Sequence, residues 1–450
     1  MAEVVVVGGG MAGVAAARLL WKEGRDVLLL EAAPRLGGKV RTVRQEGFLV
    51  EGGPDASVRY KPALLALGKE VGLEPVGTLP AKPSAYILRK GRAHPLPEGL
   101  MVFVPGDLKA LAKTPLLSLG GKLRALLEPL VPPSPKEDET LLEFTTRRFG
   151  REVFQALVAP LAGGVYGGEP EDLSVRAAFP QLWEMGRKGG LLRSALKARR
   201  ARGSREGGSL FFSFQEGLFE LIRRLSEGVP LRLSTPVLGL EAFRSGFRLH
   251  TPQGVLEAEA VILATPAPAA ARLLRPLRPE ATALLNAIPH VPSATVSLAF
   301  PRERFPEVQG HGLLIAKGEG YRVRGFTWTD QKWAGRAPEG YRLVRAYLSG
   351  EVARLSEADL IRIALEDLNR FLGTSLRPER AYAFRFPEGM PLYGLGHLER
   401  IRRLEAALPE GLFLAGNYLK GVGLPEVAES GQMAAKKALE YLGLKRPVNP

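Results

Sequence analysis

A glycine-rich string at residues 8–13 constrains the fold of this chain more than any other feature. The string, GGGMAG, follows an apolar run at 3–7 and precedes a helix-like segment at 11–23. A second apolar run at 26–31 completes a strand–helix–strand unit of about thirty residues, the spacing of a right-handed parallel crossover. The first glycine permits a tight turn, the second lets backbone amides approach a pyrophosphate, and the third lets helix and strand pack closely. The string therefore predicts a dinucleotide-binding fold at the N-terminus.

The residues after this unit indicate which dinucleotide is bound. Glu31 ends the second strand, where a carboxylate accepts hydrogen bonds from ribose hydroxyls and disfavours a 2′-phosphate. The run from Glu31 to Arg41 has the form E-x-x-x-R-x-G-G-x-x-R and resembles the amine oxidase-like FAD superfamily. In that run the glycine pair lets the backbone meet the diphosphate, and the arginines offset its charge. The run favours FAD over NAD as the cofactor.

Later segments resemble further parts of the same superfamily. The turn Gly52-Gly53-Pro54 is similar to one that lies beside the flavin ring, and Val237 matches a position whose backbone contacts the adenine. The segment at 412–423 resembles the closing motif, which points a helix N-terminus at the flavin. By this resemblance the cofactor-binding residues are Gly8, Gly9, Gly10, Met11, Ala12, Gly13, Glu31, Ala32, Arg35, Gly38, Lys39, Arg41, Gly53, Pro54, Asp55, Ala56, Val237, Gly416, Gly421, Val422 and Gly423.

The interior of the chain narrows the resemblance. The runs at 163–168 (GGVYGG), 172–180 (DLSVRAAFP), 91–97 (GRAHPLP) and 390–393 (MPLY) resemble the protoporphyrinogen/coproporphyrinogen oxidases of heme synthesis. That resemblance implies a six-electron dehydrogenation of a porphyrinogen, with hydride transfer to FAD and dioxygen as the electron acceptor. Because aromaticity supplies most of the driving force, positioning and a dry pocket matter more than a strong acid or base.

The same resemblance assigns residues to an anionic porphyrinogen substrate. Arg59 and Lys61 are the candidates for binding its propionates, and Gly164 is the candidate catalytic-site residue, expected over the flavin. Residues expected to line the apolar pocket walls are Leu314, Phe326, Thr327 and Tyr347. The pattern around Lys61 is similar to that of members acting on coproporphyrinogen. The sequence leaves open whether coproporphyrinogen III or protoporphyrinogen IX is preferred.

Hydrophobic periodicity predicts an α/β protein with three parts. A discontinuous, Rossmann-like FAD-binding domain is expected at 1–60, 205–270 and 408–450. An antiparallel-sheet substrate domain is expected at 61–98 and 271–407, where segments such as ATVSLAF have strand character. Leucines at helical spacing predict an α-helical insertion at 99–204, and the basic, glycine-containing stretch at 186–208 is interpreted as a linker.

Composition excludes several kinds of chemistry. The chain has 450 residues, no cysteine and five scattered histidines. Without cysteine there is no disulfide, iron–sulfur ligation or thioether-linked flavin, and no two histidines have ligand spacing, so no metal site is expected. We find no uncharged run long enough to span a membrane and no secretory signal before the first strand, which predicts a cytoplasmic location.

The net charge of +15 favours anionic partners. The leucine-rich segment at 100–130 and the basic stretch at 187–205 predict peripheral association with the inner face of the membrane. Nucleic acid is not expected as a partner, because the basic stretch lacks interleaved aromatic residues. A ferrochelatase would use the porphyrin product, and the sequence leaves open whether that enzyme docks on this chain.

Two other functions on the same fold remain as alternatives. A non-covalent FAD amine oxidase would need an acidic or aromatic pocket for a cation, which matches a chain of net charge +15 poorly. A carotenoid-type desaturase would share the cofactor motifs but not the 163–180 run. Bound yellow flavin after purification would separate these enzymes from a simple binding module.

Overall fold

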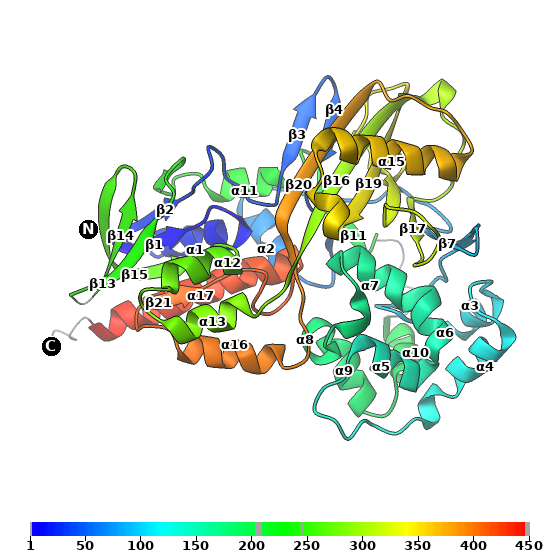
Figure 1. The fold of residues 1–450 in the computed structure, drawn as a ribbon, viewed down its shortest axis with the longest axis horizontal. Coiled ribbons are helices and arrows are strands. Elements are labelled where there is room, and N and C mark those ends of the chain that lie inside the picture. The colour runs from blue at the N-terminus through cyan, green and yellow to red at the C-terminus, as the bar shows by residue number, and fades with distance from the viewer. Residues whose placement is uncertain (1, 106, 203–208, 245, 446–450) are drawn as a thin grey trace.

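The computed structural model describes residues 2–105, 107–202, 209–244 and 246–445. Two seven-stranded sheets lie beside each other, each covered by helices, and a helical lobe packs against the second sheet (Figure 1). The arrangement is α/β with both parallel and antiparallel pairing, which confirms the predicted fold class.

The first sheet is assembled from both ends and the middle of the chain. Its strand order is β12-β2-β1-β15-β14-β13, and β21 also pairs with β15. The strands are β1 (Ala2–Val7), β2 (Val27–Leu30), β12 (Leu231–Arg232), β13 (Gly239–Phe243), β14 (Gly246–Thr251), β15 (Gly254–Leu263) and β21 (Leu412–Leu414). Strand β1 pairs in parallel with both β2 and β15, as the predicted crossover requires.

Helices cover both faces of this sheet. Successive valines of β1 point to opposite sides, so alternate valines belong to two different cores. Val4 and Val6 share one core with α1 (Met11–Lys22), α2 (Ala63–Glu70), α11 (Phe219–Leu225) and α17 (Leu424–Lys445). Val5 and Val7 share another with α12 (Ala267–Leu274), α13 (Pro279–Asn286) and α16 (His397–Ala406). A strand buried on both faces reads as a continuous apolar run, which is the pattern of residues 3–7.

The second sheet has the order β20-β16-β19-β18-β17-β7-β8. Its strands are β7 (Tyr86–Arg89), β8 (Arg92–Pro95), β16 (His290–Pro301), β17 (Gly312–Ile315), β18 (Gly325–Trp328), β19 (Tyr341–Ser349) and β20 (Arg380–Pro391). Every pair is antiparallel except β7 with β17. Helix α15 (Glu357–Leu372) covers one face and buries its apolar side there. The short helical turns α14 (Thr329–Lys332), η4 (Arg302–Arg304) and η5 (Gly350–Arg354) connect its strands.

Short helices between β10 (Val104–Pro105) and β11 (Phe211–Phe214) form the helical lobe. They are α3 (Leu108–Lys113), α4 (Leu119–Leu126), η1 (Glu128–Leu130), α5 (Leu141–Phe149), α6 (Arg151–Val153), the π-helical η2 (Phe154–Val158), α7 (Ala159–Tyr166), η3 (Pro170–Asp172), α8 (Val175–Ala178), α9 (Pro180–Arg187) and α10 (Leu191–Arg202). The interpretation of 186–208 as a linker is wrong for most of its length, because α10 buries Leu191, Leu192 and Ala195. Residues 203–208 lie outside the described residues.

Small sheets complete the fold between these layers. They are the hairpin β3 (Thr42–Gln45) with β4 (Phe48–Glu51), the sheet β5-β11-β6 (Ser57–Val58, Phe211–Phe214 and Pro75–Gly77), and the pair β9 (Leu100–Met101) with β10 (Val104–Pro105). These assignments do not test the proposed domain boundaries, which stay a prediction. Within the described ranges, no helix combines the length and hydropathy needed to cross a bilayer.

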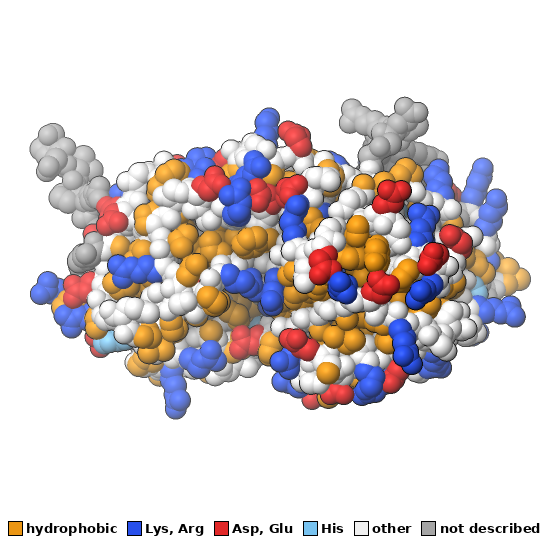
Figure 2. Space-filling model, turned by 90° about the horizontal axis from the view of Figure 1, so that it is seen from above, with side chains coloured by type: hydrophobic (Ala, Val, Ile, Leu, Met, Phe, Trp, Pro, Cys, Tyr) orange, Lys and Arg blue, Asp and Glu red, His pale blue; other side chains and the backbone are white. Residues whose placement is uncertain are grey.

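Charge is spread over the surface. On the face shown in Figure 2, Lys and Arg side chains occur around the whole outline, with Asp and Glu among them. The net charge of +15 is therefore not gathered in one block on this face.

Candidate functional site: a dinucleotide cradle facing a sheet wall

The glycine string forms a tight turn between β1 and α1 that leaves no room for side chains at two positions. Gly8 has φ +108°, and a Cβ there would lie 2.6 Å from the carbonyl oxygen of Ala264. A Cβ at Gly13 would lie 1.8 Å from the carbonyl oxygen of Gly8. The first and third glycines therefore have the turn and packing roles expected from the sequence.

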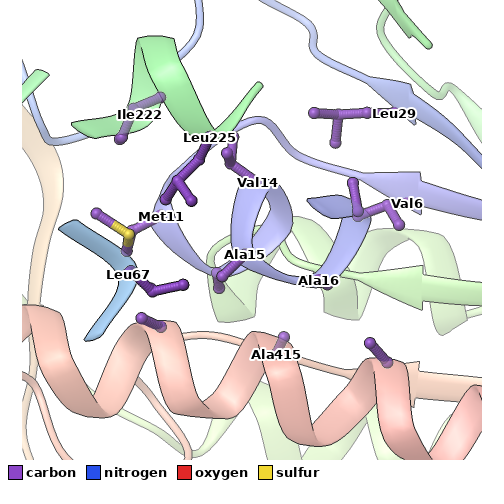
Figure 3. Packing of buried hydrophobic residues seen from close by; sticks show 14 of the residues in the cluster. Val6, Met11, Val14, Ala15, Ala16, Leu29, Leu67, Ile222, Leu225 and Ala415 are labelled. Atoms are coloured by element: carbon purple, nitrogen blue, oxygen red, sulfur yellow. The ribbon is translucent and has the colours of Figure 1, made fainter. Parts of the chain in front are cut away.

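The N-terminus of α1 is open at the middle glycine. No heavy atom lies within 4 Å of a Cβ built at Gly10, the residue that precedes α1. The helix packs closely on its other sides. A Cβ at Gly431 of α17 would lie 2.0 Å from the carbonyl oxygen of Ala12, and Val14 and Ala15 lie among apolar residues of neighbouring elements (Figure 3). The first amides of α1 have no partner within the helix, and the space beside Gly10 at this helix end is open, as a site for a diphosphate requires.

Glu31 is held beside this turn by backbone amides. Its Oε2 accepts a hydrogen bond from the N–H of Gly9 at 2.6 Å, and its Oε1 accepts one from Ala33 at 2.8 Å. The N–H of Thr235 donates to the carbonyl of Glu31 at 2.9 Å, which brings the segment containing Val237 alongside. A fixed carboxylate at this strand end can accept hydrogen bonds from ribose hydroxyls with its remaining lone pairs. The open helix end, the tight glycine turn and this carboxylate fit FAD.

The predicted cations surround the cradle. Arg35 donates to the carbonyl oxygens of Leu36 and Gly38, at 3.0 and 3.2 Å. The Arg41 guanidinium lies 4.9 Å from the centre of the Phe384 ring. Burial lowers the pKa of Lys39 to about 8, although Glu388 opposes the shift. An anion that binds near Lys39 would favour its charged form and so offset the free-energy cost of burying it.

The turn from Gly52 to Asp55 is held by side chains of the second sheet and α14. Thr295 donates to the carbonyl of Gly52 at 2.7 Å, and Arg345 donates to the carbonyl of Gly53. Asp55 accepts from Lys332 at 2.7 Å and from the Trp333 indole at 3.3 Å. Burial alone would raise the pKa of Asp55, but Lys332 and Arg345 hold it well below its ordinary range. The carboxylate of Asp55 therefore fixes the turn, which leaves the backbone of Gly53, Pro54 and Ala56 to meet a cofactor.

The closing motif meets the cradle from the other chain end. Gly416 has φ +146°, and its N–H donates to the hydroxyl of Ser430 at 3.0 Å. Gly421 has φ +101° and lies against Glu426 in the first turn of α17. Val422 packs against the core of the helical lobe. The structure thus brings the residues before α17 between the first sheet and that lobe.

Several predicted substrate residues lie on one face of the second sheet. A Cβ at Gly164 of α7 would lie 3.3 Å from Cδ2 of Leu314 on β17. On β18 and β19, Thr327 Oγ1 and the Tyr347 hydroxyl are 3.0 Å apart. These four residues form a wall between the helical lobe and the second sheet, and Gly164 itself is exposed. The preceding π-helical turn is a feature that recurs near functional sites.

Phe326 does not share this wall. It neighbours Thr327 on β18, so strand alternation turns its side chain to the opposite face. There it stacks at 6.1 Å on Trp328 and is buried in the core beneath α15. The prediction that both Phe326 and Thr327 line the pocket is therefore wrong for Phe326, because consecutive residues of a strand face opposite sides of the sheet.

Arg59 and Lys61 have different surroundings. The Arg59 guanidinium lies 5.7 Å from the centre of the Phe212 ring, and its Nε is buried without a hydrogen-bond partner. Lys61 instead forms an ion pair with Glu426 of α17. Nothing in the sequence near Lys61 indicated that partner, which is distant in the chain.

Sequence reasoning missed Arg345, Thr295 and Lys332, which hold the cofactor turn. Arg345 is 3% exposed, and its guanidinium lies 4.9 Å from the centre of the Tyr347 ring. The sequence did hold a signal for Arg345. It is a charged residue inside the apolar strand segment at 341–349, two positions before Tyr347 and therefore on the same face of the strand. Among the described residues, no group of three or more His, Asp or Glu side chains is placed to hold a metal.

His397 supports the loop that carries the closing motif. It is fully buried, its Nε2 lies 3.0 Å from the carbonyl oxygen of Leu419, and its ring stacks at 4.1 Å on Tyr393. Burial lowers the pKa of His397 to about 4 from its ordinary 6.5, although the hydrogen bond to Leu419 opposes the shift. The folded protein therefore holds the ring neutral.

We expect His397 to make the protein acid-sensitive. A depressed histidine pKa gives stability that is complete above about pH 6.5 and is lost as the pH falls towards 4, by roughly 3 kcal/mol in all. Unfolding free energies at neutral and mildly acidic pH should show this loss, and His397→Gln should reduce the difference. His250→Gln, at a half-exposed histidine, is the control; equal pH dependence in wild type and His397→Gln would contradict the expectation.

Comparisons with known proteins agree with this geometry. Residues 11–439 match the family model described as flavin containing amine oxidoreductase. The chain is 34% identical to a coproporphyrinogen III oxidase of Bacillus subtilis, over 98% of both proteins. It is 30% identical to chloroplastic protoporphyrinogen oxidase 1 of spinach, over 98% of this chain and 84% of that protein.

Solved structures extend the same similarity. A crystal structure from Exiguobacterium, provisionally named a protoporphyrinogen oxidase, is 32% identical, with TM-score 0.86 over 97% of this chain and 98% of that one. Cyclohexylamine oxidase from Brevibacterium oxydans is 19% identical with TM-score 0.70, over 98% of this chain and 99% of that one, and shares the fold. These matches confirm the resemblance inferred from the motifs.

Proposed function

Because the chain belongs to the flavin containing amine oxidoreductase family, we propose that it is an FAD-dependent oxidase that converts a porphyrinogen into the porphyrin. The full-length similarity to a coproporphyrinogen III oxidase carries this proposal. FAD would accept the electron pairs removed from the substrate, and dioxygen is the proposed final electron acceptor. Protein groups then need to orient the macrocycle and exclude water rather than supply strong acid or base.

The residues of this chain suit that task. Gly8, Gly13 and Glu31 shape the cradle, and Asp55 fixes the turn beside it. The wall formed by Gly164, Leu314, Thr327 and Tyr347 offers an apolar surface with hydroxyls at one edge. The glycine at 164 keeps that wall flat, since a larger side chain would meet Leu314. Such a wall supports binding of a broad, flat ring.

The reaction is tested with the purified, FAD-loaded enzyme. We expect oxidation of coproporphyrinogen III, protoporphyrinogen IX or both, read as porphyrin fluorescence together with oxygen consumption. Gly164→Val should lower kcat/KM by about tenfold or more while FAD stays bound, because the valine side chain would project from the flat wall and displace the macrocycle. Gly163→Ala is the control, since a Cβ there has only ordinary contacts. Oxidation of an amine without oxidation of either porphyrinogen would show that the assignment is wrong.

Peripheral association with a membrane is the second part of the proposal, with the protein in the cytoplasm at the inner face. Leu119, Leu123 and Leu126 of α4, with Leu127 and Leu130, follow helical spacing and are 45% to 76% exposed. Helices α3 and α10 of the same lobe carry exposed cations, including Lys113, Arg193 and Lys197, and α10 contacts η1 beside Leu130. An exposed apolar stripe beside cations suits an anionic bilayer surface.

Flotation with anionic liposomes tests this association. We expect wild type to float at low salt, and Leu123→Glu with Leu127→Glu to remain in solution because charges replace the apolar stripe. Leu355→Glu, at an exposed leucine that directly follows η5 and lies outside the helical lobe, is the control. Wild type that stays wholly in the soluble fraction at low salt would contradict the proposal. Docking of a ferrochelatase stays a prediction without a surface assigned to it.

A further inference from the structure

Arg345 is a buried cation directly behind the cofactor turn. It lies on β19, is 3% exposed, and donates a hydrogen bond to the carbonyl of Gly53. Strand β4, which leads into the turn, packs on the second sheet through Phe48 and Val50, so the turn and the sheet are held together. The guanidinium also lies 4.9 Å from the centre of the Tyr347 ring. One positive charge is thereby fixed between the cofactor turn and the wall.

The hydrogen-bonding capacity of Arg345 is only partly used. Its Nη2 donates to Gly53, whereas Nε and Nη1 are buried and have no hydrogen-bond partner among the described residues. Its neighbours on β16 and β18 are Ser297 and Thr327, which carry no charge. Oδ1 of Asp55 lies 4.0 Å from Nη1, beyond hydrogen-bond distance. In a water-excluded interior such a charge acts on its surroundings with little screening.

Cations outnumber carboxylates at this place. Asp55 pairs with Lys332 at 2.7 Å, closer than it lies to Arg345. Glu51, the other buried carboxylate nearby, interacts more strongly with Arg336 than with Arg345. Burial raises the pKa of Glu51 and so favours its neutral form. Of these five described side chains, three are cationic and two are carboxylates, so a positive charge is left over, and Arg345 carries it.

A surplus positive charge at this place favours an anion that forms nearby. Oxidised FAD has a neutral isoalloxazine ring, and a hydride, which brings two electrons and one proton, gives that ring a negative charge. A fixed charge in a water-excluded site stabilises the charge that develops during the reaction more than it stabilises the neutral reactant. We propose that Arg345 acts through the turn to stabilise the anionic reduced flavin, and so raises the reduction potential of the bound FAD.

This role rests on the proposed function in one respect, the place of the flavin ring beside the turn. It holds for any donor that reduces the ring. Because Arg345 acts through the backbone of Gly53, it is a positioning residue, and the potential of the flavin is the property that reports on it.

The test measures the reduction potential of FAD bound to the full chain, by equilibration with a reference dye and without substrate. Arg345→Gln should lower the equilibrium constant for two-electron reduction by about tenfold, which corresponds to about 30 mV. Sulfite forms an anionic adduct with flavin, so its Kd should rise by about tenfold in the same variant. Arg345→Lys keeps the charge and should leave both values within about threefold of wild type.

Two controls separate the charge of Arg345 from its support of the turn. Thr295 donates to the carbonyl of Gly52 at 2.7 Å, so Thr295→Val loosens the same turn without removing a charge, and it should leave the reduction constant within about threefold of wild type. Arg304→Gln removes an exposed charge from η4 and should leave the constant unchanged. An equal shift in Thr295→Val and Arg345→Gln would show that geometry, and not charge, sets the potential.

Asp55→Asn reverses the sign of the expected shift. It removes a carboxylate beside Lys332 and Arg345 while keeping its shape, so the reduction constant should rise by about tenfold. A shift of Asp55→Asn and Arg345→Gln in the same direction, or of neither, would overturn the role of Arg345. If Arg345→Gln does not retain FAD, the absence of a rise in Asp55→Asn overturns it. Because no porphyrinogen is present, a wild type that oxidises no porphyrinogen would refute the proposed function without affecting this result.

Discussion

Gly13→Val will yield a protein without bound FAD and without oxidase activity. A Cβ at residue 13 would lie 1.8 Å from the carbonyl oxygen of Gly8 and 3.2 Å from the side chain of Ala264. The nearest of these atoms belongs to backbone, which cannot turn away as a flexible side chain can. Helix α1 would have to move off β1, and the open amides at its N-terminus would move with it. The diphosphate site depends on that placement.

The ratio of flavin to protein absorbance after purification measures this effect directly. We expect at least a hundredfold loss of FAD affinity, the order of magnitude that follows when several charge-assisted hydrogen bonds are lost together. Gly443→Ala is the matched control, because a Cβ there meets no atom within 4 Å and the residue lies at the far end of α17. A Gly13→Val protein that keeps stoichiometric FAD would show that the diphosphate does not bind at this helix end.

Local patterns were sufficient to predict the cradle. The expected strand at 3–7, helix at 11–23 and strand at 26–31 correspond to β1 (Ala2–Val7), α1 (Met11–Lys22) and β2 (Val27–Leu30). Each is specified by neighbouring residues: an apolar run, a glycine turn and a helical repeat. Glu31 could be placed for the same reason, since its position depends only on where β2 ends. FAD could be chosen over NAD because the distinguishing run lies within ten residues of Glu31.

Pairings between distant segments could not be predicted in this way. The ion pair of Lys61 with Glu426 joins residues 365 positions apart, and the hydrogen bond from Arg345 to Gly53 joins residues 292 positions apart. Such contacts depend on how the two sheets are placed, which no local pattern encodes. Phe326 is a different case, because strand parity relative to Thr327 was available in the sequence. Parity alone does not say which face meets the substrate, and the packing of α15 decides it.

Glu128→Ala will destabilise the helical lobe more than any surface change. Glu128 and Arg148 are 0% and 1% exposed and form an ion pair at 2.7 Å. Glu128 also accepts hydrogen bonds from the amides of Leu191 and Leu192, at 2.9 and 3.0 Å, where α10 begins. Removing the carboxylate leaves a buried guanidinium without its anion and two amides without acceptors. We expect a loss of about 3–5 kcal/mol in the free energy of unfolding.

Denaturant unfolding of the FAD-loaded protein, followed by tryptophan fluorescence because Trp183 lies in this lobe, measures the loss. Glu184→Ala breaks an ion pair with Lys188 at 3.8 Å on an exposed face and should cost no more than about 0.5 kcal/mol. Glu128→Leu combined with Arg148→Met should recover much of the stability, since a buried charge pair gains little over apolar packing while a lone buried charge costs much. Equal stability of Glu128→Ala and Glu184→Ala would mean that water reaches Arg148. In that case the lobe that presents Gly164 to the second sheet is held by its apolar core alone.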